Sequence, residues 1–241
     1  MSRLYQVSQD EAAFQKGRIC VEVLANRFRD DVGWRDPRDP DGYSSLGLAH
    51  GSAGIAFAAA GFASQTRCEK AKDLAVKALQ FDRRFYLNRE NNWPVHAGEQ
   101  SASMPAWCAG LPGMLLARLA VAEISDHPQL LEEIDRILRH FPEQLGLDFW
   151  WCGSLGLAQV LMFAAAGLRR PDLQAKAHAM LSSIIERALR TCYFRLSRSA
   201  AENYCFQPSL FRGFSGIAYS ALRFGSSGKI PSILAFEIGA G

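Results

Sequence analysis

Two kinds of helical pattern alternate along the chain. In the first, apolar residues recur at the 3.6-residue spacing of one helix face and polar residues occupy the other faces. Two sets show it clearly: Leu130, Leu131, Ile134, Ile137, Leu138 and Phe141, and Leu181, Ile184, Ile185, Ala188 and Leu189. In the second, short runs are apolar on every face, which predicts buried helices. These runs are 55–63, 114–122, 157–166 and 217–224.

A short motif precedes each apolar run: a glycine, two residues, a second glycine and an apolar residue. The four copies begin at Gly51, Gly110, Gly153 and Gly213. Their first glycines are 59, 43 and 60 residues apart, and each interval is long enough for one helical hairpin.

Further helices are expected at about 9–29 and 67–89, and only the tail 231–237 has the period-two alternation of an extended segment. The pattern therefore predicts an all-α protein in which outer amphipathic helices alternate with inner apolar ones.

Glycine at the start of a helix has two physical uses: it leaves backbone N–H groups accessible, and it lets a neighbouring helix or ligand approach closely. If the four motifs are arranged cyclically, their loops lie at one end of a helical barrel and direct the preceding residues into one mouth. Those residues are Ala49 and His50, Cys108 and Ala109, Trp151 and Cys152, and Phe211 and Arg212. The simpler alternative is that the glycines only permit tight helix packing. A histidine and two cysteines in this register favour a functional role.

Composition limits the class of protein. The chain has 241 residues, 49% of them hydrophobic, which is enough to bury a sizeable core and argues against disorder. A formal charge of +3 with dispersed basic residues indicates neither nucleic acid nor an anionic membrane as partner. The most apolar stretches, 47–63 and 150–168, are interrupted before the roughly 20 continuous apolar residues that a membrane span needs.

The N-terminus and the cysteines predict a cytoplasmic protein. Acidic residues follow soon after Met1, and no apolar segment with a small-residue cleavage site is present, so no signal peptide is expected. The six cysteines lack the dense even spacing of a secreted disulfide scaffold, so reduced thiols are expected. In that setting a cysteine is most often a small buried hydrophobe.

Ordered motifs follow one another along nearly the whole chain. They are Gly47-Leu-Ala-His-Gly-Ser-Ala-Gly-Ile55, Asn92-Trp-Pro94, Trp107-Cys-Ala-Gly-Leu-Pro-Gly-Met114, Cys152-Gly-Ser-Leu-Gly156, Leu210-Phe-Arg-Gly-Phe-Ser-Gly-Ile-Ala-Tyr219 and Pro231-Ser-Ile-Leu234. In content and order they resemble the lanthionine synthetase C-like (LanC-like) cyclases. The closest likeness is to the C-terminal cyclase part of the class II (LanM-type) lanthipeptide synthetases.

The resemblance implies an all-α fold, an α/α toroid of seven helical hairpins with an inner and an outer ring. The four motifs supply about four of the seven inner repeats, so residues 1–241 correspond to the C-terminal portion of a LanC-like cyclase domain and form a partial ring. The dehydratase half and the early cyclase repeats of the family are absent from these residues, so the chain either works with a separately encoded remainder or derives from a truncated gene. A partial ring would leave apolar inner faces uncovered.

The resemblance also implies a reaction: a cysteine thiol of a dehydrated precursor peptide adds to a dehydroamino acid and closes a lanthionine thioether ring. Such an addition needs a thiolate, which a zinc ion can generate, and an acid that protonates the resulting enolate. His50 matches the family histidine assigned to acid–base catalysis. Without the resemblance, a lone histidine beside an apolar helix would be interpreted as a core residue.

Cys108 and Cys152 match family zinc ligands by resemblance. Trp151 occupies the position of the third ligand, and an indole has no lone pair for a metal. Catalytic zinc usually keeps three protein ligands, so a further ligand would come from Cys205, His96 or His50. The competing interpretation is that the two cysteines are buried thiols without a metal.

Two alternatives to a cyclase stay open. The first is a degenerate toroid that binds a peptide or a protein partner without catalysis, which Trp151 and the missing repeats favour. The second is a toroid that acts on carbohydrate, which would need paired carboxylates at the barrel mouth. None of the four loop starts carries a carboxylate, so the carbohydrate hypothesis is the least favoured of the three.

Overall fold

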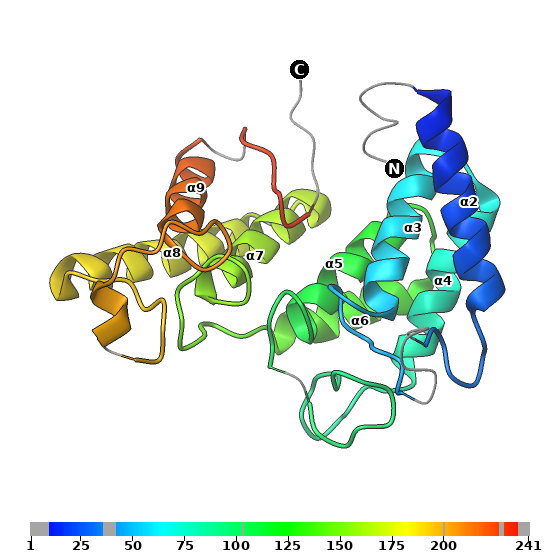
Figure 1. Cartoon of the computed structure of the whole chain (residues 1–241), viewed down its shortest axis with the longest axis horizontal. Coiled ribbons are helices and arrows are strands. Elements are labelled where there is room, and N and C mark those ends of the chain that lie inside the picture. The colour runs from blue at the N-terminus through cyan, green and yellow to red at the C-terminus, as the bar shows by residue number, and fades with distance from the viewer. Residues whose placement is uncertain (1–9, 36–41, 103, 200, 227–228, 236–241) are drawn as a thin grey trace. The chain divides into compact units, whose positions relative to one another are not determined.

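Helices account for all the regular elements of the described residues, apart from isolated β-bridges. The structure, a computed structural model, describes residues 10–35, 42–102, 104–199, 201–226 and 229–235 (Figure 1). The helices are α2 (Glu11–Arg27), α3 (Ser52–Thr66), α4 (Glu69–Arg83), α5 (Leu111–Ala122), α6 (Pro128–Arg139), α7 (Ser154–Leu168), α8 (Pro171–Thr191), the 3-10 helix η1 (Ala201–Tyr204) and α9 (Phe214–Gly225). The all-α prediction is confirmed.

The chain divides into two compact units, Met1–Phe141 and Pro142–Gly241. The first unit contains α2 to α6, and the second contains α7, α8, η1 and α9. Among the described helices, none combines the length and the apolar character that crossing a bilayer requires.

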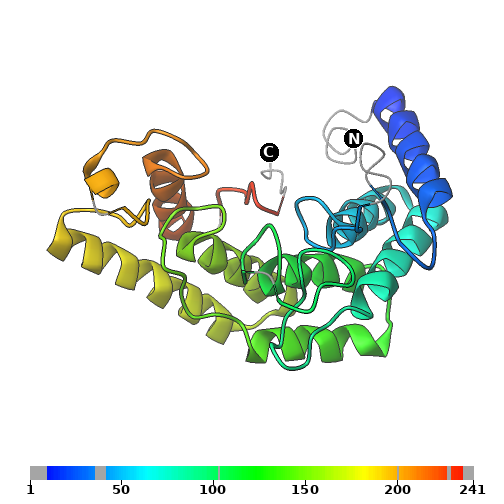
Figure 2. The ribbon, with the colours of Figure 1, turned by 60° about the horizontal axis from the view of Figure 1, so that its bottom comes forward.

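In the first unit, α3 packs against α4 and α5, α5 packs against α6, and α2 contacts α4 (Figures 1 and 2). Helix α5 is apolar on nearly all faces, and its residues 111–121 are all buried. Helix α6 is amphipathic: Ile134 and Ile137 are buried, whereas Leu131 is 60% exposed although the spacing predicted it on the apolar face. Apolar inner helices therefore alternate with amphipathic outer ones, as predicted.

In the second unit, α7 packs against both α8 and α9. Most of α7 is buried, because its run of Leu, Val, Met and Ala presents apolar side chains on every face. Helix α8 buries Leu181, Ile184 and Ala188 against it and leaves Leu189 76% exposed. The same alternation of an apolar and an amphipathic helix thus recurs here.

Two predicted segments differ from the structure. The expected helix 67–89 is α4, because Arg67 adopts a left-handed conformation (φ 55°) that ends α3 and the chain leaves the helix after Arg83. The described part of the tail, 231–235, forms turns rather than an extended strand. There the hydroxyl of Tyr219 donates to the carbonyl of Pro231 and accepts from the N–H of Ile233. Residues 236–237 of the predicted tail, and Gln9 of the predicted helix 9–29, lie outside the described residues.

Candidate functional site

The loop that carries His50 is held by backbone hydrogen bonds on both sides. The N–H of Leu46 donates to the carbonyl of Val95 at 3.0 Å, which ties the loop to the segment after the Trp-Pro motif. The N–H of Ser52, in the first turn of α3, donates to the carbonyl of Ser45 at 3.1 Å. The loop therefore folds back over the start of α3 and holds the backbone of His50 at a fixed point.

The glycine pairs allow this fold-back. A Cβ atom on Gly54 would lie 2.1 Å from the carbonyl oxygen of Leu48, and one on Gly216 would lie 2.1 Å from that of Leu210. Both carbonyls belong to the residue six positions earlier, so these two motifs encode the same turn. The first-turn N–H groups are bonded to the loop, for example Phe214 to Gln207 at 2.7 Å. At the starts of α3, α7 and α9 the expectation that the glycines leave these groups accessible is therefore wrong, because the loop itself uses them.

The loops of His50 and Cys108 meet in the first unit. The N–H of Ala49 donates to the carbonyl of Cys108 at 3.2 Å. Gly47 permits this approach, because a Cβ there would lie 2.4 Å from the same carbonyl oxygen. Two of the residues that the sequence singled out are thus carried by hydrogen-bonded loops.

An equivalent bond joins two loops of the second unit. The N–H of Trp151 donates to the carbonyl of Phe211 at 3.2 Å. Ala49, Cys108, Trp151 and Phe211 all stand two residues before the first glycine of their motifs. Within each unit, consecutive motifs therefore place their loops at the same end of neighbouring inner helices, as the repeat predicted.

The side chains at this site differ in exposure. His50 is exposed, and its imidazole makes no hydrogen bond or ion pair with the described residues. Cys108 is half-buried and follows Trp107, whose indole is buried in the first unit. The imidazole of His50 is thus accessible to solvent, and its loop is hydrogen-bonded to the backbone of Cys108.

His96 lies next to this site and is paired with Glu99. Its Nδ1 is 2.9 Å from Oε1 of Glu99, and its backbone N–H donates to Oε2 of the same carboxylate at 3.1 Å. The hydrogen bond from the His96 side chain is the main cause that lowers the pKa of Glu99 below its usual value. The pair is 40% exposed on each side chain, and it fixes the ring of a residue that the sequence offered as a metal ligand.

Cys152 belongs to the second unit, where it is half-buried in the loop before α7. Its neighbour Trp151 packs its ring 4.8 Å from the ring of Phe211. Trp150 is fully buried and lies 5.7 Å from the same Phe211 ring. The tryptophan in the family's ligand register therefore contributes to the packing between the two loops.

The residues do not complete a three-ligand zinc site within either unit. In the part of the chain that the structure describes, no group of three or more His, Cys, Asp and Glu side chains converges as metal ligands. Cys108 lies in the first unit and Cys152 in the second, while Cys205 is exposed and His96 is held by Glu99. The two family-matched cysteines therefore belong to different units.

Sequence reasoning missed a buried charge cluster beneath the Trp-Pro motif. Arg118 of α5 is fully buried and donates to Asp82 at 2.9 Å and to Glu133 at 2.7 Å. Its guanidinium carbon lies 4.5 Å from the centre of the Trp93 ring, and the Trp93 indole donates to the backbone carbonyl of Asp82 at 2.9 Å. Arg83 donates to Glu133 from the opposite side. The cluster joins α4, α5, α6 and the Trp-Pro loop.

Burial raises the pKa of Asp82 from 3.8 to about 6, although Arg118 lowers it through charge and a hydrogen bond. The Oδ2 atom of Asp82 is buried and has no hydrogen-bond partner in the described structure. Desolvation therefore outweighs the single contact with Arg118.

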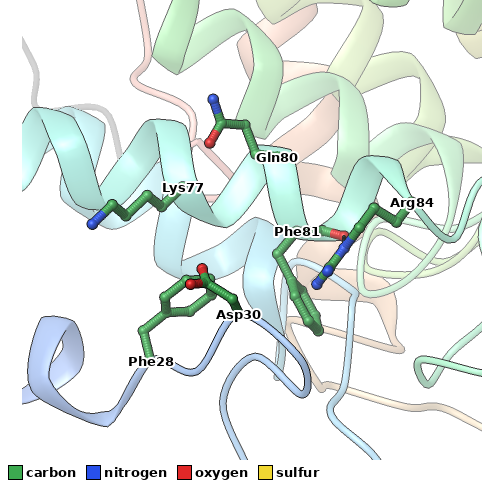
Figure 3. Close-up of a pocket in the computed structure, with 6 residues that line it drawn as sticks. All are labelled: Phe28, Asp30, Lys77, Gln80, Phe81 and Arg84. Carbon is green, nitrogen blue, oxygen red and sulfur yellow. Dashed lines mark hydrogen bonds between the residues drawn. The ribbon is translucent and has the colours of Figure 1, made fainter.

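A pocket of about 210 Å³ in the first unit contains none of the predicted site residues. It is lined by Phe28, Asp30, Lys77, Gln80, Phe81 and Arg84 (Figure 3). The rings of Phe28 and Phe81 meet edge to face, and the guanidinium of Arg84 lies 4.7 Å from the centre of the Phe81 ring. We interpret the pocket as part of the packing between α4 and the segment that follows α2.

The family model described as lanthionine synthetase C-like protein matches residues 1–235. The chain belongs to the lanthionine synthetase C-like family. A search among curated protein sequences finds no match.

A solved structure has a similar fold. The chain is similar to nisin cyclase with a TM-score of 0.74 and 19% sequence identity, over 94% of this chain. At that identity the likeness shows the fold alone, and it confirms the α/α-toroid class of helical hairpins. The chain spans 61% of the length of nisin cyclase. The closer likeness to class II synthetases stays a prediction.

Proposed function

We propose that this LanC-like chain takes part in lanthipeptide cyclisation, the addition of a peptide cysteine thiol to a dehydroamino acid. Family membership supports the class of reaction, and the name of the similar structure, nisin cyclase, agrees with it. The observation that carries the proposal is the hydrogen bond from Ala49 to Cys108, which joins the His50 loop to the loop of the first family-matched cysteine.

In this proposal His50 donates the proton that the α carbon of the dehydroamino acid takes up. The thiolate forms a carbon–sulfur bond at the β carbon of the dehydroamino acid, and the electron pair of the double bond becomes an enolate. Protonation of the α carbon then completes the thioether, so the product has the same composition as the substrate. The imidazole of His50 is exposed and makes no hydrogen bond with the described residues, so it is accessible to a substrate as a general acid.

Zinc enters the proposal through Cys108 and Cys152, the two ligands that this chain contributes. Neither unit alone completes a three-ligand site among the described residues, and the role proposed for His50 does not depend on the metal. The zinc content of the purified protein tests this part separately from the reaction.

We also propose that residues 1–241 act as the C-terminal portion of a cyclase domain. The chain carries four motif helices and spans 61% of the nisin cyclase chain, which supports this assignment. The expected partners are a dehydrated precursor peptide and a dehydratase with an N-terminal cyclase half. The cytoplasmic location predicted from the sequence is part of this proposal.

A non-catalytic peptide-binding toroid is the second candidate. The packing of the Trp151 ring on Phe211 favours it. Trp151 occupies the sequence position of a family zinc ligand, and its indole cannot bind a metal. The two candidates make different predictions for a substrate that can cyclise.

The test is a peptide with one cysteine and one dehydroalanine, incubated with the protein alone and with its dehydratase partner. Ring closure leaves the mass unchanged, so remaining thiols are labelled with N-ethylmaleimide and counted by mass spectrometry. Protein-dependent loss of labelling supports the cyclase. Peptide binding with full labelling in both preparations overturns it and supports the non-catalytic toroid.

A further inference from the structure

A cavity of about 550 Å³ in the second unit has none of the proposed cyclisation residues in its lining. One wall is a single face of α8, formed by residues at positions 176, 179, 180, 183, 184 and 187. The opposite wall is the segment 143–148 with Ser154 at the start of α7. We call this cavity the α8 groove.

Charged groups of both signs line the α8 groove, with cations in excess. Lys176, Arg187 and Arg195 oppose Glu143 and Asp148. Asp148 is buried and already bonded: it accepts from the guanidinium of Arg187 and from the backbone N–H of Arg195 at 2.6 Å. The carboxylate that remains available is that of Glu143, which is exposed.

Two of the cations lack full partners in the described residues. Lys176 makes no ion pair or hydrogen bond with them, although it is half-buried. The contact with Asp148 fixes one side of the Arg187 guanidinium, while its Nη1 is buried without a hydrogen-bond partner in the described structure. A buried donor without an acceptor is costly, so an incoming acceptor would be stabilised there.

The spacing of these cations indicates the shape of the ligand. Lys176 and Arg187 are eleven residues apart on one helix, which separates them by about 16 Å along its axis. That distance is about five residues of extended chain. Between them lie the apolar Met180 and Ile184 and the hydroxyl of Ser183. A long groove with cations at its ends and apolar and polar groups between suits an extended peptide better than a compact anion.

We propose that the α8 groove binds an extended acidic peptide segment. One carboxylate pairs with Lys176, and a second pairs with the end formed by Arg187 and Arg195. This inference rests on the proposed function in one respect: the acidic segment is taken to belong to the precursor peptide. Binding itself needs no ring closure, so it is measured with a peptide that cannot cyclise.

The probe is a fluorescein-labelled, capped hexapeptide with glutamate at both ends and leucine and serine between, compared with a glutamine-ended peptide of the same sequence. Fluorescence polarisation of the full chain is expected to show tighter binding of the glutamate peptide at low salt. Binding weakens as salt rises, because the screening length falls from about 30 Å at 0.01 M to about 10 Å at 0.1 M.

Variants separate the groove from general charge effects. Lys176→Glu should weaken binding about tenfold or more, whereas Lys70→Glu, the same change at an exposed lysine of α4, should leave it unchanged. Ala179→Trp, which fills the groove without changing charge, should also weaken binding. Glu143→Gln should strengthen it about twofold, because it removes the available carboxylate.

Several results would overturn the proposal. Equal affinity for the glutamate and glutamine peptides would show that the groove cations do not pair with the peptide carboxylates. An equal loss in Lys70→Glu and Lys176→Glu places binding outside the groove. Tighter binding of a labelled single-stranded hexanucleotide than of the acidic peptide assigns the groove to another ligand class. Because none of these measurements involves cyclisation, a failed cyclase assay leaves them valid.

Discussion

The ion-pair partners of Arg118 could not be predicted from the sequence. It is the one charge in the otherwise apolar run 111–122, and such a charge signals a buried partner. The sequence gives no way to choose that partner among 24 acidic residues. Asp82 and Glu133 are 36 and 15 residues away, and only the packing of α4 and α6 on α5 brings them to the guanidinium.

His50 and the two cysteines were found from the motifs, whereas Glu99 was not. The family resemblance selects residues by register, and it contains no information on a pair such as His96 and Glu99, which lies outside the matched motifs. The local signal was the three-residue spacing of the two side chains on one turn. Sequence reasoning treated His96 only as a metal ligand.

Asp82 gives a prediction at the residue scale, the pH dependence of stability. Its pKa is about 6 in the folded protein against 3.8 for the free side chain, because burial penalises the carboxylate. The stability that it contributes is therefore fully present below pH 3.8 and is lost as the pH rises through about 6. Between pH 5 and pH 7 this loss amounts to about 1 kcal/mol.

Urea unfolding of wild type and Asp82→Asn at pH 5, 6 and 7 checks this prediction. The difference between the two proteins should change across the range, since asparagine does not titrate and other ionisable groups are shared. Asp172→Asn, at a fully exposed carboxylate, is the control and should follow wild type. A constant difference between wild type and Asp82→Asn would show that Asp82 is ionised throughout.

At the scale of elements, the repeat was the most informative feature of the sequence. The alternation of amphipathic and apolar runs located the helices, and the glycine motifs located their starts. Ends were less accurate: the run 67–89 continues in pattern beyond Arg83, where the chain turns toward the Trp-Pro loop. The tail 231–237 alternates in pattern, yet hydrogen bonds to Tyr219 hold its described part in turns.

Two glycines of α3 give a matched test of the fold-back. A Cβ on Gly54 would lie 2.1 Å from the carbonyl oxygen of Leu48, while one on Gly61 meets nothing within 4 Å. Gly54→Ala should therefore destabilise the protein by about 1–3 kcal/mol through overpacking. Gly61→Ala should stabilise it by about 0.5–1 kcal/mol through helix propensity.

Urea unfolding of both variants measures these shifts. A neutral Gly54→Ala would mean that the loop can move away from α3, and the glycine pair would then not be needed for the turn that carries His50. Destabilisation by Gly61→Ala to the same extent would attribute both effects to the helix rather than to the loop.

At the scale of the whole molecule, the fold class followed from the motifs, and the family model and the structural match confirm it. The candidate site followed only in part. The sequence identified the loops, and the structure joined those of His50 and Cys108 through their backbones. Cys108 and Cys152 belong to different units, and the sequence pattern contains no information on this division.

Metal content tests the assignment of Cys108 and Cys152. The protein is expected to contain about one zinc per chain, and Cys108→Ala or Cys152→Ala should lose most of it, because each change removes a thiolate ligand. Cys20→Ala and Cys192→Ala, at exposed cysteines, serve as controls and should keep the metal. Zinc-free wild type in a zinc-supplemented preparation would support the interpretation of the two residues as buried thiols.

The central claim is that His50 serves ring closure, and the most direct measurement is the initial rate at which a cysteine–dehydroalanine peptide loses its reactive thiol. With the partner present, His50→Asn should lower this rate about 100-fold or more, as expected for loss of a general acid. His140→Asn, at an exposed histidine after α6, should keep the wild-type rate. Equal rates for wild type and His50→Asn would contradict the account.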